Sequence, residues 1–138
     1  ATQDAKNRKF DEAILLDKEN NVSEAPGENI FLIKNNTLIT PSLSSSALDG
    51  ITRKSILEFS KSLKIKSVVK TITKYQLKKA DEVFLTGTAA EITPVIKIDS
   101  KKIGNGKVGI ITKKIMNEYT EIVMNKNKKF AKWLTRVY

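Results

Sequence analysis

Two apolar runs joined by a pair of asparagines constrain the fold more than any other segment of this chain. The runs are NIFLIK, residues 29–34, and TLIT, residues 37–40. Each has the length and composition of a short strand. Asn35-Asn36 fits a two-residue hairpin turn, because asparagine tolerates the positive φ angles that such a turn requires. We therefore expect an antiparallel hairpin over residues 29–40.

The rest of the sequence alternates between strand and helix patterns. Expected strands cover residues 11–17, 66–73, 81–86 and 94–99, and expected helices cover residues 51–64, 74–80 and a long stretch from about residue 109. Residues 1–10 read as the end of a helix whose beginning is missing. This alternation predicts a mixed α/β fold, with a curved sheet or partly closed barrel flanked by helices.

Helical spacing of apolar residues supports three of these expectations. The stripes are Ile56, Phe59, Ser60 and Leu63, then Ile111, Ile115, Tyr119 and Ile122, and finally Phe130, Trp133, Leu134 and Val137. We expect the last stretch to dock on the domain.

Composition sets limits on the function. The chain has 138 residues, which fits one domain, and it contains neither cysteine nor histidine. Disulfides, metal sites with Cys or His ligands and histidine-based proton transfer are therefore excluded. The lack of cysteine fits a cytoplasmic protein. No apolar run of about 18 residues and no signal peptide is present, so we expect no membrane partner.

The net charge of +10 raises the question of nucleic-acid binding. Only Arg8, Arg53 and Arg136 are arginines, and the lysines are spread along the chain. No zinc-finger, RNP or helix-turn-helix signature occurs. The charge is therefore more typical of compositional bias with solvated lysines, and we expect no nucleic-acid partner.

Three loop segments carry residues that could bind a ligand. In LDGITR, residues 48–53, Gly50 allows close approach, and the N–H groups of Ile51 and Thr52 with the Thr52 hydroxyl could bind an anion such as phosphate. The alternative is ordinary helix N-capping by Asp49 or Thr52. TGTAAE, residues 86–91, offers the Thr88 hydroxyl and backbone donors, or is simply a tight turn.

The third segment is SEAPGEN, residues 23–29, in which Glu24 stands at a strand end beside Pro26 and Gly27. By itself, Glu24 could be an ordinary surface glutamate. The functional interpretation of these three loops depends on their order along the chain.

That order resembles the signature of the class IV (fold type IV) aminotransferases, which use pyridoxal phosphate. The matching residues are Glu24, Asn29-Ile30-Phe31, Leu38-x-Thr40 and Leu48-x-Gly50-Ile51-x-Arg53. ADEVFLTGTAAEITPV, residues 80–95, is similar to the branched-chain amino acid aminotransferases in particular, because D-amino acid aminotransferases and aminodeoxychorismate lyases usually differ around residues 86–90. The resemblance runs from FDEAILLD to GKVGIIT. Pro26 departs from it, since the family usually has a small residue there.

The resemblance implies one cofactor site. Glu24 would face the pyridine nitrogen and keep it protonated, and Leu48 would pack against the ring. The phosphate would be bound by Gly50, Ile51 and Thr52 and by the Thr88 hydroxyl. The turn at Thr88-Ala89 would bind the substrate α-carboxylate through backbone N–H groups. Glu28 and Asn29 would hold the loop in shape.

The resemblance also implies groups that this chain does not contain. The family's Schiff-base lysine would lie roughly ten residues before Ala1, followed by a tyrosine, and a small N-terminal domain would supply an arginine for the phosphate. We therefore expect residues 1–138 to be a C-terminal cofactor-binding domain with no catalytic residue of its own, inactive alone and binding the cofactor weakly at best.

The parent enzyme would move the amino group of leucine, isoleucine or valine to 2-oxoglutarate as a homodimer or higher homo-oligomer. No metal site is expected. One alternative is a non-catalytic remnant of the same fold that binds phosphate or a partner. The other is a different class IV member, such as a D-amino acid aminotransferase or an aminodeoxychorismate lyase.

Overall fold

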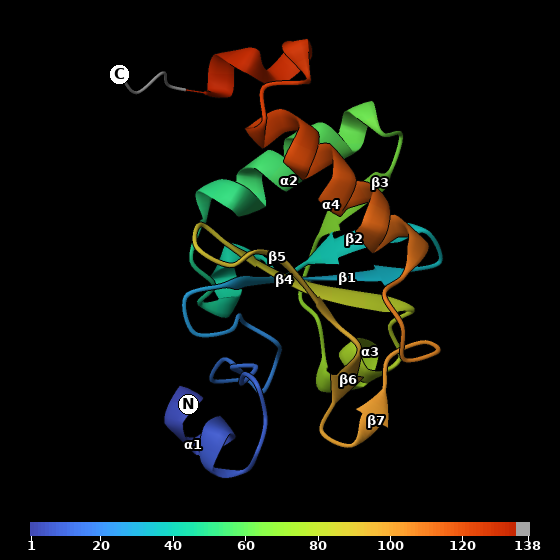
Figure 1. Cartoon of the computed structure of the whole chain (residues 1–138). Helices are drawn as coiled ribbons and strands as arrows, with labels where there is room; N and C mark the ends of the chain where they lie inside the picture. Colours follow the sequence, from blue (N-terminus) through green and yellow to red (C-terminus); the bar gives the residue numbers. More distant parts are fainter. Residues whose placement is uncertain (135–138) are drawn as a thin grey trace.

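A five-stranded mixed sheet forms the centre of the computed structural model, which describes residues 1–134 (Figure 1). Its strand order is β3-β2-β1-β4-β5, with β2 and β3 parallel and all other neighbours antiparallel. The strands are β1 (Asn29–Lys34), β2 (Thr37–Thr40), β3 (Lys66–Val69), β4 (Glu82–Gly87) and β5 (Glu91–Val95). The mixed α/β class is confirmed. The sheet is open, because β3 and β5 are both edge strands.

The expected hairpin over residues 29–40 is confirmed. Lys34 pairs with Thr37, so the turn between β1 and β2 contains only two residues. Those residues, Asn35 and Asn36, have φ angles of 49° and 58°. Asparagine adopts this left-handed conformation at low cost, which is why it joins the two strands so tightly.

Helices α2 (Ile51–Ser62) and α4 (Ile110–Val123) cover one face of the sheet (Figure 1). Phe31 of β1 and Phe84 of β4 stack on this face with ring centroids 5.0 Å apart, and they pack against the buried side chains of both helices. The helical stripes of both helices therefore face the core as expected. The 3-10 segment η2 (Lys128–Trp133) continues this layer through Phe130 and Trp133. Val137 lies outside the described residues.

The opposite face of the sheet packs against α3 (Lys74–Lys78), the segment of residues 13–25 and the region of the small hairpin β6 (Lys97–Ile98) and β7 (Lys101–Lys102). Successive side chains of a strand point to opposite faces, so Ile30 and Leu32 enter this second core while Phe31 and Ile33 enter the first. Burial on both faces explains why β1 is apolar along nearly its whole length.

Three strand predictions were wrong or too long. Residues 11–17 form no strand of the sheet, and Leu16 makes only an isolated bridge with Val22. The Asp17 carboxylate accepts hydrogen bonds from the N–H groups of Glu19 and Asn21, which turns the chain at once. The strand expected over 66–73 ends at Val69, and the one expected over 94–99 is divided between β5 and β6. The N-terminal helix, α1, covers Thr2–Asn7.

The start of α4 is capped by a carboxylate from the sheet. Glu82 at the start of β4 accepts hydrogen bonds from the backbone N–H groups of Ile111 and Thr112, at 3.1 and 2.7 Å, and from the Thr112 hydroxyl at 2.6 Å. Gly109, the N-cap residue, has no room for a β-carbon beside the Glu82 side chain. This contact ties α4 to the sheet and complements the positive end of the helix dipole.

We predict that Glu82→Ala lowers the free energy of unfolding by about 2 kcal/mol, because it removes charge-assisted hydrogen bonds and the side-chain cap at the start of α4. The control is Glu58→Ala, which removes an exposed ion pair with Lys61 and should cost about 0.5 kcal/mol or less. Urea unfolding of the two variants measures the difference. Equal losses would show that Glu82 does not anchor α4.

Candidate functional site

All three loops that the sequence singled out lie at the same ends of the five strands. We call these strand ends the site edge of the sheet, to distinguish them from the edge strands β3 and β5. At this edge β1 and β5 begin and β2, β3 and β4 end, as the strand directions require. The loops at residues 24–28, 41–50 and 88–90 therefore all leave the sheet on the same side (Figure 1). Glu24, Thr52 and Thr88 are distant in the sequence, and the topology brings the segments that carry them to one end of the domain.

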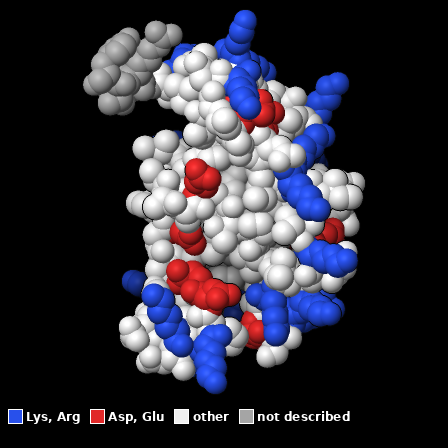
Figure 2. All heavy atoms as spheres, in the orientation of Figure 1, with Lys and Arg blue, Asp and Glu red and all other residues white. Residues whose placement is uncertain are grey.

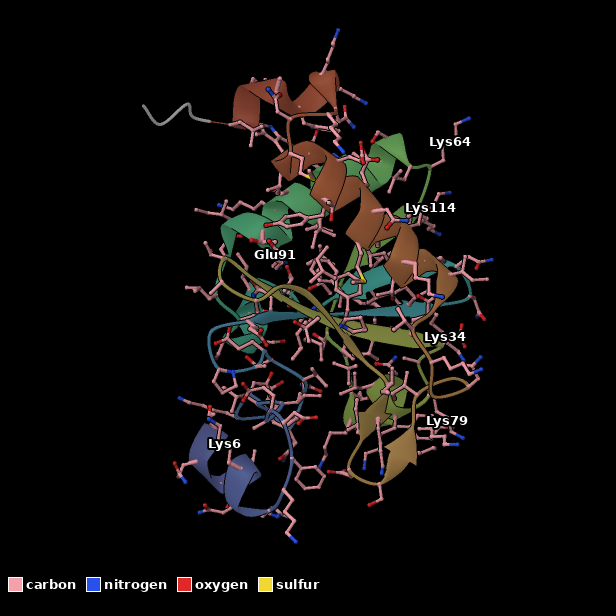
Figure 3. The ribbon with its side chains drawn as sticks, viewed as in Figure 1. Lys6, Lys34, Lys64, Lys79, Glu91 and Lys114 are labelled. Carbon is pink, nitrogen blue, oxygen red and sulfur yellow. The ribbon has the colours of Figure 1, made fainter. Side chains whose placement is uncertain are left out.

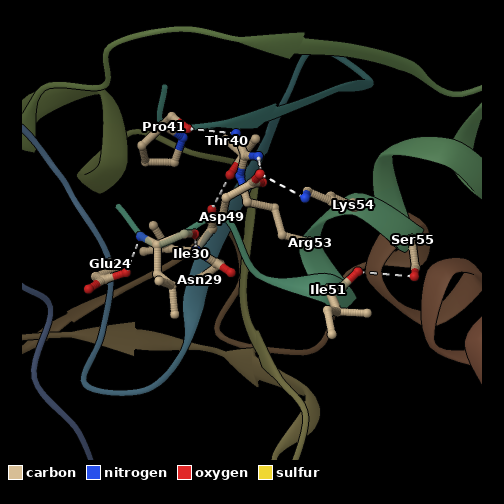
Figure 4. A network of polar contacts seen from close by, with 11 residues as sticks. Glu24, Asn29, Ile30, Thr40, Pro41, Asp49, Ile51, Arg53, Lys54 and Ser55 are labelled. Carbon is tan, nitrogen blue, oxygen red and sulfur yellow. Dashed lines mark hydrogen bonds and ion pairs between the residues drawn. The ribbon is translucent and has the colours of Figure 1, made fainter. Parts of the chain in front are cut away.

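The backbone of Leu48 is held by the side chains of Glu24 and Asn29, both of which Figure 4 labels. Its N–H donates to Oε2 of Glu24 at 2.8 Å, and its carbonyl accepts from Nδ2 of Asn29 at 2.6 Å. Glu24 is half-buried and Asn29 is buried. Among the described residues, Oε1 of Glu24 has no hydrogen bond, so that oxygen is available for a ligand.

The start of α2 lacks a side-chain cap. Gly50 is the N-cap residue, and neither Asp49 nor Thr52 caps the helix, so the N-capping alternative is wrong. Asp49 instead pairs with Arg53 at 3.4 Å and with Lys54 at 2.8 Å. The N–H groups of the first helical residues, Ile51 among them, have no partner within the helix and can bind an anion.

Large apolar side chains are exposed around this helix start. Leu48 is 69% exposed and Ile51 is 78% exposed. Thr52, by contrast, is buried, and its hydroxyl makes no hydrogen bond with another described residue. Leu48 thus offers an exposed apolar side chain two residues before the N-cap Gly50, which suits a ligand that joins an apolar ring to an anionic group.

The turn between β4 and β5 lies against the loop that follows Glu24. A β-carbon on Gly87 would come within 2.9 Å of the Gly27 carbonyl oxygen, so only glycine permits this approach. Thr88 and Ala89 follow directly and are exposed. The structure thus brings Glu24 into contact with Leu48, whereas Thr88 reaches the same edge without a hydrogen bond to Glu24 or to Thr52.

Arg53 belongs to the motif that the sequence matched, but the pattern assigned it no role. It is only 5% exposed, and its guanidinium donates to the Pro41 carbonyl oxygen at 3.1 Å (Figure 4). Two buried side-chain polar atoms of the described residues have no hydrogen-bond partner, Nε of Arg53 and Oγ1 of Thr86. The scarcity of arginine in a lysine-rich chain and the i, i+4 spacing from Asp49 were the available signals.

The basic charge is not concentrated at this edge. On the face that Figure 2 shows, Lys and Arg side chains lie at the upper end, along one side and at the lower end, with acidic groups between them. The lysines labelled in Figure 3, Lys6, Lys34, Lys64, Lys79 and Lys114, are all exposed. Residues 1–134 contain no group of three or more acidic side chains placed to bind a metal, and no helix in that range could cross a membrane.

Comparison with known proteins identifies the family. Residues 1–98 match the protein family described as amino-transferase class IV. The chain belongs to the class IV aminotransferases. It is 49% identical over 130 residues to a probable branched-chain-amino-acid aminotransferase of Aquifex aeolicus, covering 94% of this chain and 42% of that protein. It is 43% identical over 137 residues to the branched-chain-amino-acid aminotransferase of Pseudomonas aeruginosa, covering 99% and 44%.

Solved structures agree. The branched-chain aminotransferase of Thermoproteus uzoniensis with norvaline is 44% identical, with a TM-score of 0.96, covering 100% of this chain and 46% of that one. The branched-chain amino acid aminotransferase of Thermobaculum terrenum in its PLP-form is 32% identical, with a TM-score of 0.95, covering 98% and 44%. The chain is a homologue of these class IV aminotransferases and spans less than half of their length. The family predicted from the sequence is confirmed.

Folding shifts the pKa of Glu28, which lies at the site edge of the sheet. Burial beside Gly87 raises the pKa of the Glu28 carboxyl above its ordinary value of 4.5, and the nearby Glu12 carboxylate raises it further. The folded chain therefore binds this proton more tightly than the unfolded chain does. Stability contributed by Glu28 is lost as the pH rises from about 4.5 through the raised pKa.

We accordingly predict that Glu28→Gln raises the melting temperature at pH 7, and that this gain disappears below pH 4.5, the ordinary value. Glu19→Gln, at an exposed loop position, is the control and should have little effect at either pH. Thermal unfolding followed at pH 7 and at pH 4 measures both variants. A destabilised Glu28→Gln at neutral pH would contradict this account.

Proposed function

We propose that this chain is the C-terminal, cofactor-binding domain of a pyridoxal-phosphate-dependent aminotransferase. The parent enzyme moves the amino group of leucine, isoleucine or valine to 2-oxoglutarate. The observation that carries the proposal is the convergence of Glu24, the uncapped start of α2 and the turn at Thr88-Ala89 on one edge of the sheet. Homologues at 43–49% identity that are branched-chain aminotransferases support the substrate class.

The residues at this edge fit pyridoxal phosphate by their chemistry. The N–H groups of Ile51 and Thr52 are donors at the positive end of a 12-residue helix. Leu48 offers an apolar surface for the ring. When bound, the cofactor supplies an electron-accepting ring that stabilises negative charge at the substrate Cα. A relative of this fold has been solved with pyridoxamine 5'-phosphate, which agrees with this assignment.

Glu24 holds a proton on the ring nitrogen. Its Oε2 is already occupied by the Leu48 N–H, so Oε1 remains as the acceptor for a protonated pyridine nitrogen. A carboxylate next to this nitrogen favours its cationic form, because opposite charges at short distance stabilise each other. The Leu48 hydrogen bond fixes the carboxylate orientation that this task needs.

The turn at Thr88-Ala89 binds the phosphate and the substrate carboxylate. Its side chains are small and exposed, so both anions can reach the backbone N–H groups, and the Thr88 hydroxyl adds a donor. The proposed site within residues 1–138 includes no Schiff-base lysine. The parent enzyme acts as a homodimer or higher homo-oligomer.

The phosphate contacts can be tested on the 138-residue chain. Thr52→Val and Thr88→Val should each weaken pyridoxal phosphate binding by about ten- to a hundredfold, because a hydrogen bond to a charged group contributes roughly 1.5–3 kcal/mol. Thr120→Val on the exposed side of α4 is the matched control and should leave the affinity unchanged. Titration followed by phosphorus NMR measures all three variants. Unchanged affinity in both site variants would remove the phosphate site from α2.

The role of Glu24 can be tested in the full-length protein by substitution with glutamine. The Leu48 N–H requires an acceptor, so the introduced amide would present its oxygen to Leu48 and its NH2 group to the ring nitrogen. We predict that Glu24→Gln therefore leaves the ring nitrogen unprotonated, which slows removal of the substrate Cα proton. The ¹⁵N chemical shift of ring-labelled cofactor reports this directly.

Two further variants complete this test. Glu24→Ala should also slow the first half-reaction with leucine, followed in single-turnover experiments, while retaining most of the cofactor. Glu28→Gln serves as the control and should leave the ¹⁵N shift unchanged, because the Glu28 side chain packs beside Gly87 at the end of β4. A ring nitrogen that stays protonated in Glu24→Gln would remove Glu24 from its assigned role.

A further inference from the structure

We propose that Asn29 is a positioning residue that couples the two ends of the ligand site through the backbone of Leu48. The inference rests on the proposed function and goes beyond it, because Asn29 touches neither the ring nitrogen nor the phosphate in that account. Its amide binds the Leu48 carbonyl oxygen, while Glu24 binds the N–H of the same residue. The Leu48 backbone is thus the polar link between Glu24 and Gly50, the N-cap residue of α2.

The surroundings of Asn29 hold its side-chain amide in one position. It is the first residue of β1, it is buried, and it lies opposite Thr86 in the central strand pair. A strand position paired on one side and buried beneath α2 has little freedom to move. The Asn29 side chain therefore fixes the position of the adjacent loop relative to the sheet.

Asn29 also determines where α2 begins. A β-carbon on Gly50 would collide with Oδ1 of Asn29, so the N-cap residue packs directly against this amide. The Leu48 carbonyl oxygen accepts a second hydrogen bond, from the Gly50 N–H at 2.9 Å. One side chain thus sets both the Leu48 peptide and the residue from which the free N–H groups of the helix follow.

Arg53 holds the same loop from its other side. Its guanidinium binds the Pro41 carbonyl oxygen and the Asp49 carboxylate, so the segment of residues 41–50 is pinned at both ends. With Arg53 in place, loss of the Asn29 contact frees chiefly Leu48 and Gly50. The Glu24 carboxylate and the Ile51 N–H should then lose their placement together, although they serve opposite ends of the ligand.

The first measurement is amide hydrogen exchange in the ligand-free 138-residue chain. Asn29→Ala should speed exchange at Leu48 about tenfold relative to Phe31, the loss expected for one buried hydrogen bond. Thr40→Val is the matched control. It removes a buried hydrogen bond between two strand residues, from Oγ1 of Thr40 to the Ile30 carbonyl oxygen at 2.7 Å, and should leave Leu48 unchanged.

The second measurement is pyridoxal phosphate affinity of the same chains. Asn29→Ala should lower this affinity about tenfold, because it displaces the loop that binds the cofactor. Thr40→Val should leave the affinity unchanged, because it lowers the stability of the domain without displacing that loop. In the Glu24→Ala background, Asn29→Ala should change the affinity much less than it does in the wild type, because both side chains act through Leu48. Asn29→Asp keeps the shape but loses the donor, and it replaces Asn29→Ala if that variant does not fold.

The outcomes separate the two proposals. Faster exchange at Leu48 in Asn29→Ala, together with a full-length protein that does not bind the cofactor, would overturn the proposed cofactor site and support the positioning role. Cofactor binding by the wild type with equal exchange and affinity in Asn29→Ala and Thr40→Val would overturn the positioning role and support the cofactor site.

Discussion

The antiparallel pairing of β1 with β4 determines where the other parts of this domain lie. Both strands are buried on both faces, and their register places Phe31 against Phe84 beneath the two helices. The same register places Asn29 opposite Thr86 at one edge and Ile33 opposite Glu82 towards the other. One edge anchors the ligand site and the other anchors α4, so the pairing fixes both.

The candidate site depends on polar contacts within a framework held by apolar packing. The loop of residues 41–50 contains one short 3-10 segment, and its end is fixed by Glu24, Asn29 and Arg53. Hydrogen bonds of buried groups specify geometry strongly, because leaving a buried partner unpaired costs far more than the bond itself contributes. The sheet provides a rigid base, and these three side chains set the orientation of the loop on it.

Much of this arrangement could be predicted from the sequence, and the exceptions have physical causes. The hairpin, α2 and α4 were predictable because Asn35-Asn36 and the helical stripes report local constraints. The strand expected over 11–17 was wrong, since an apolar run indicates burial but not a pairing partner. The site segments were found through their order along the chain. The capping by Glu82 depends on a contact between residues distant in sequence, which a local pattern does not report. The burial of Arg53 depends on a distant contact with Pro41, and its only signals were the scarcity of arginine and the spacing from Asp49.

The outer edge of β3 has a consequence for how molecules of this chain approach one another. An unpaired strand edge is a template for pairing with another chain, which promotes aggregation. Here that edge is four residues long, begins with the exposed Lys66 and is followed by the exposed Lys70. A second copy adding a strand would bring these ammonium groups close to its own, within a molecule that already carries a net charge of +10. Such repulsion weakens as salt shortens the Debye length, so the resistance of the chain to edge-to-edge association falls with rising ionic strength.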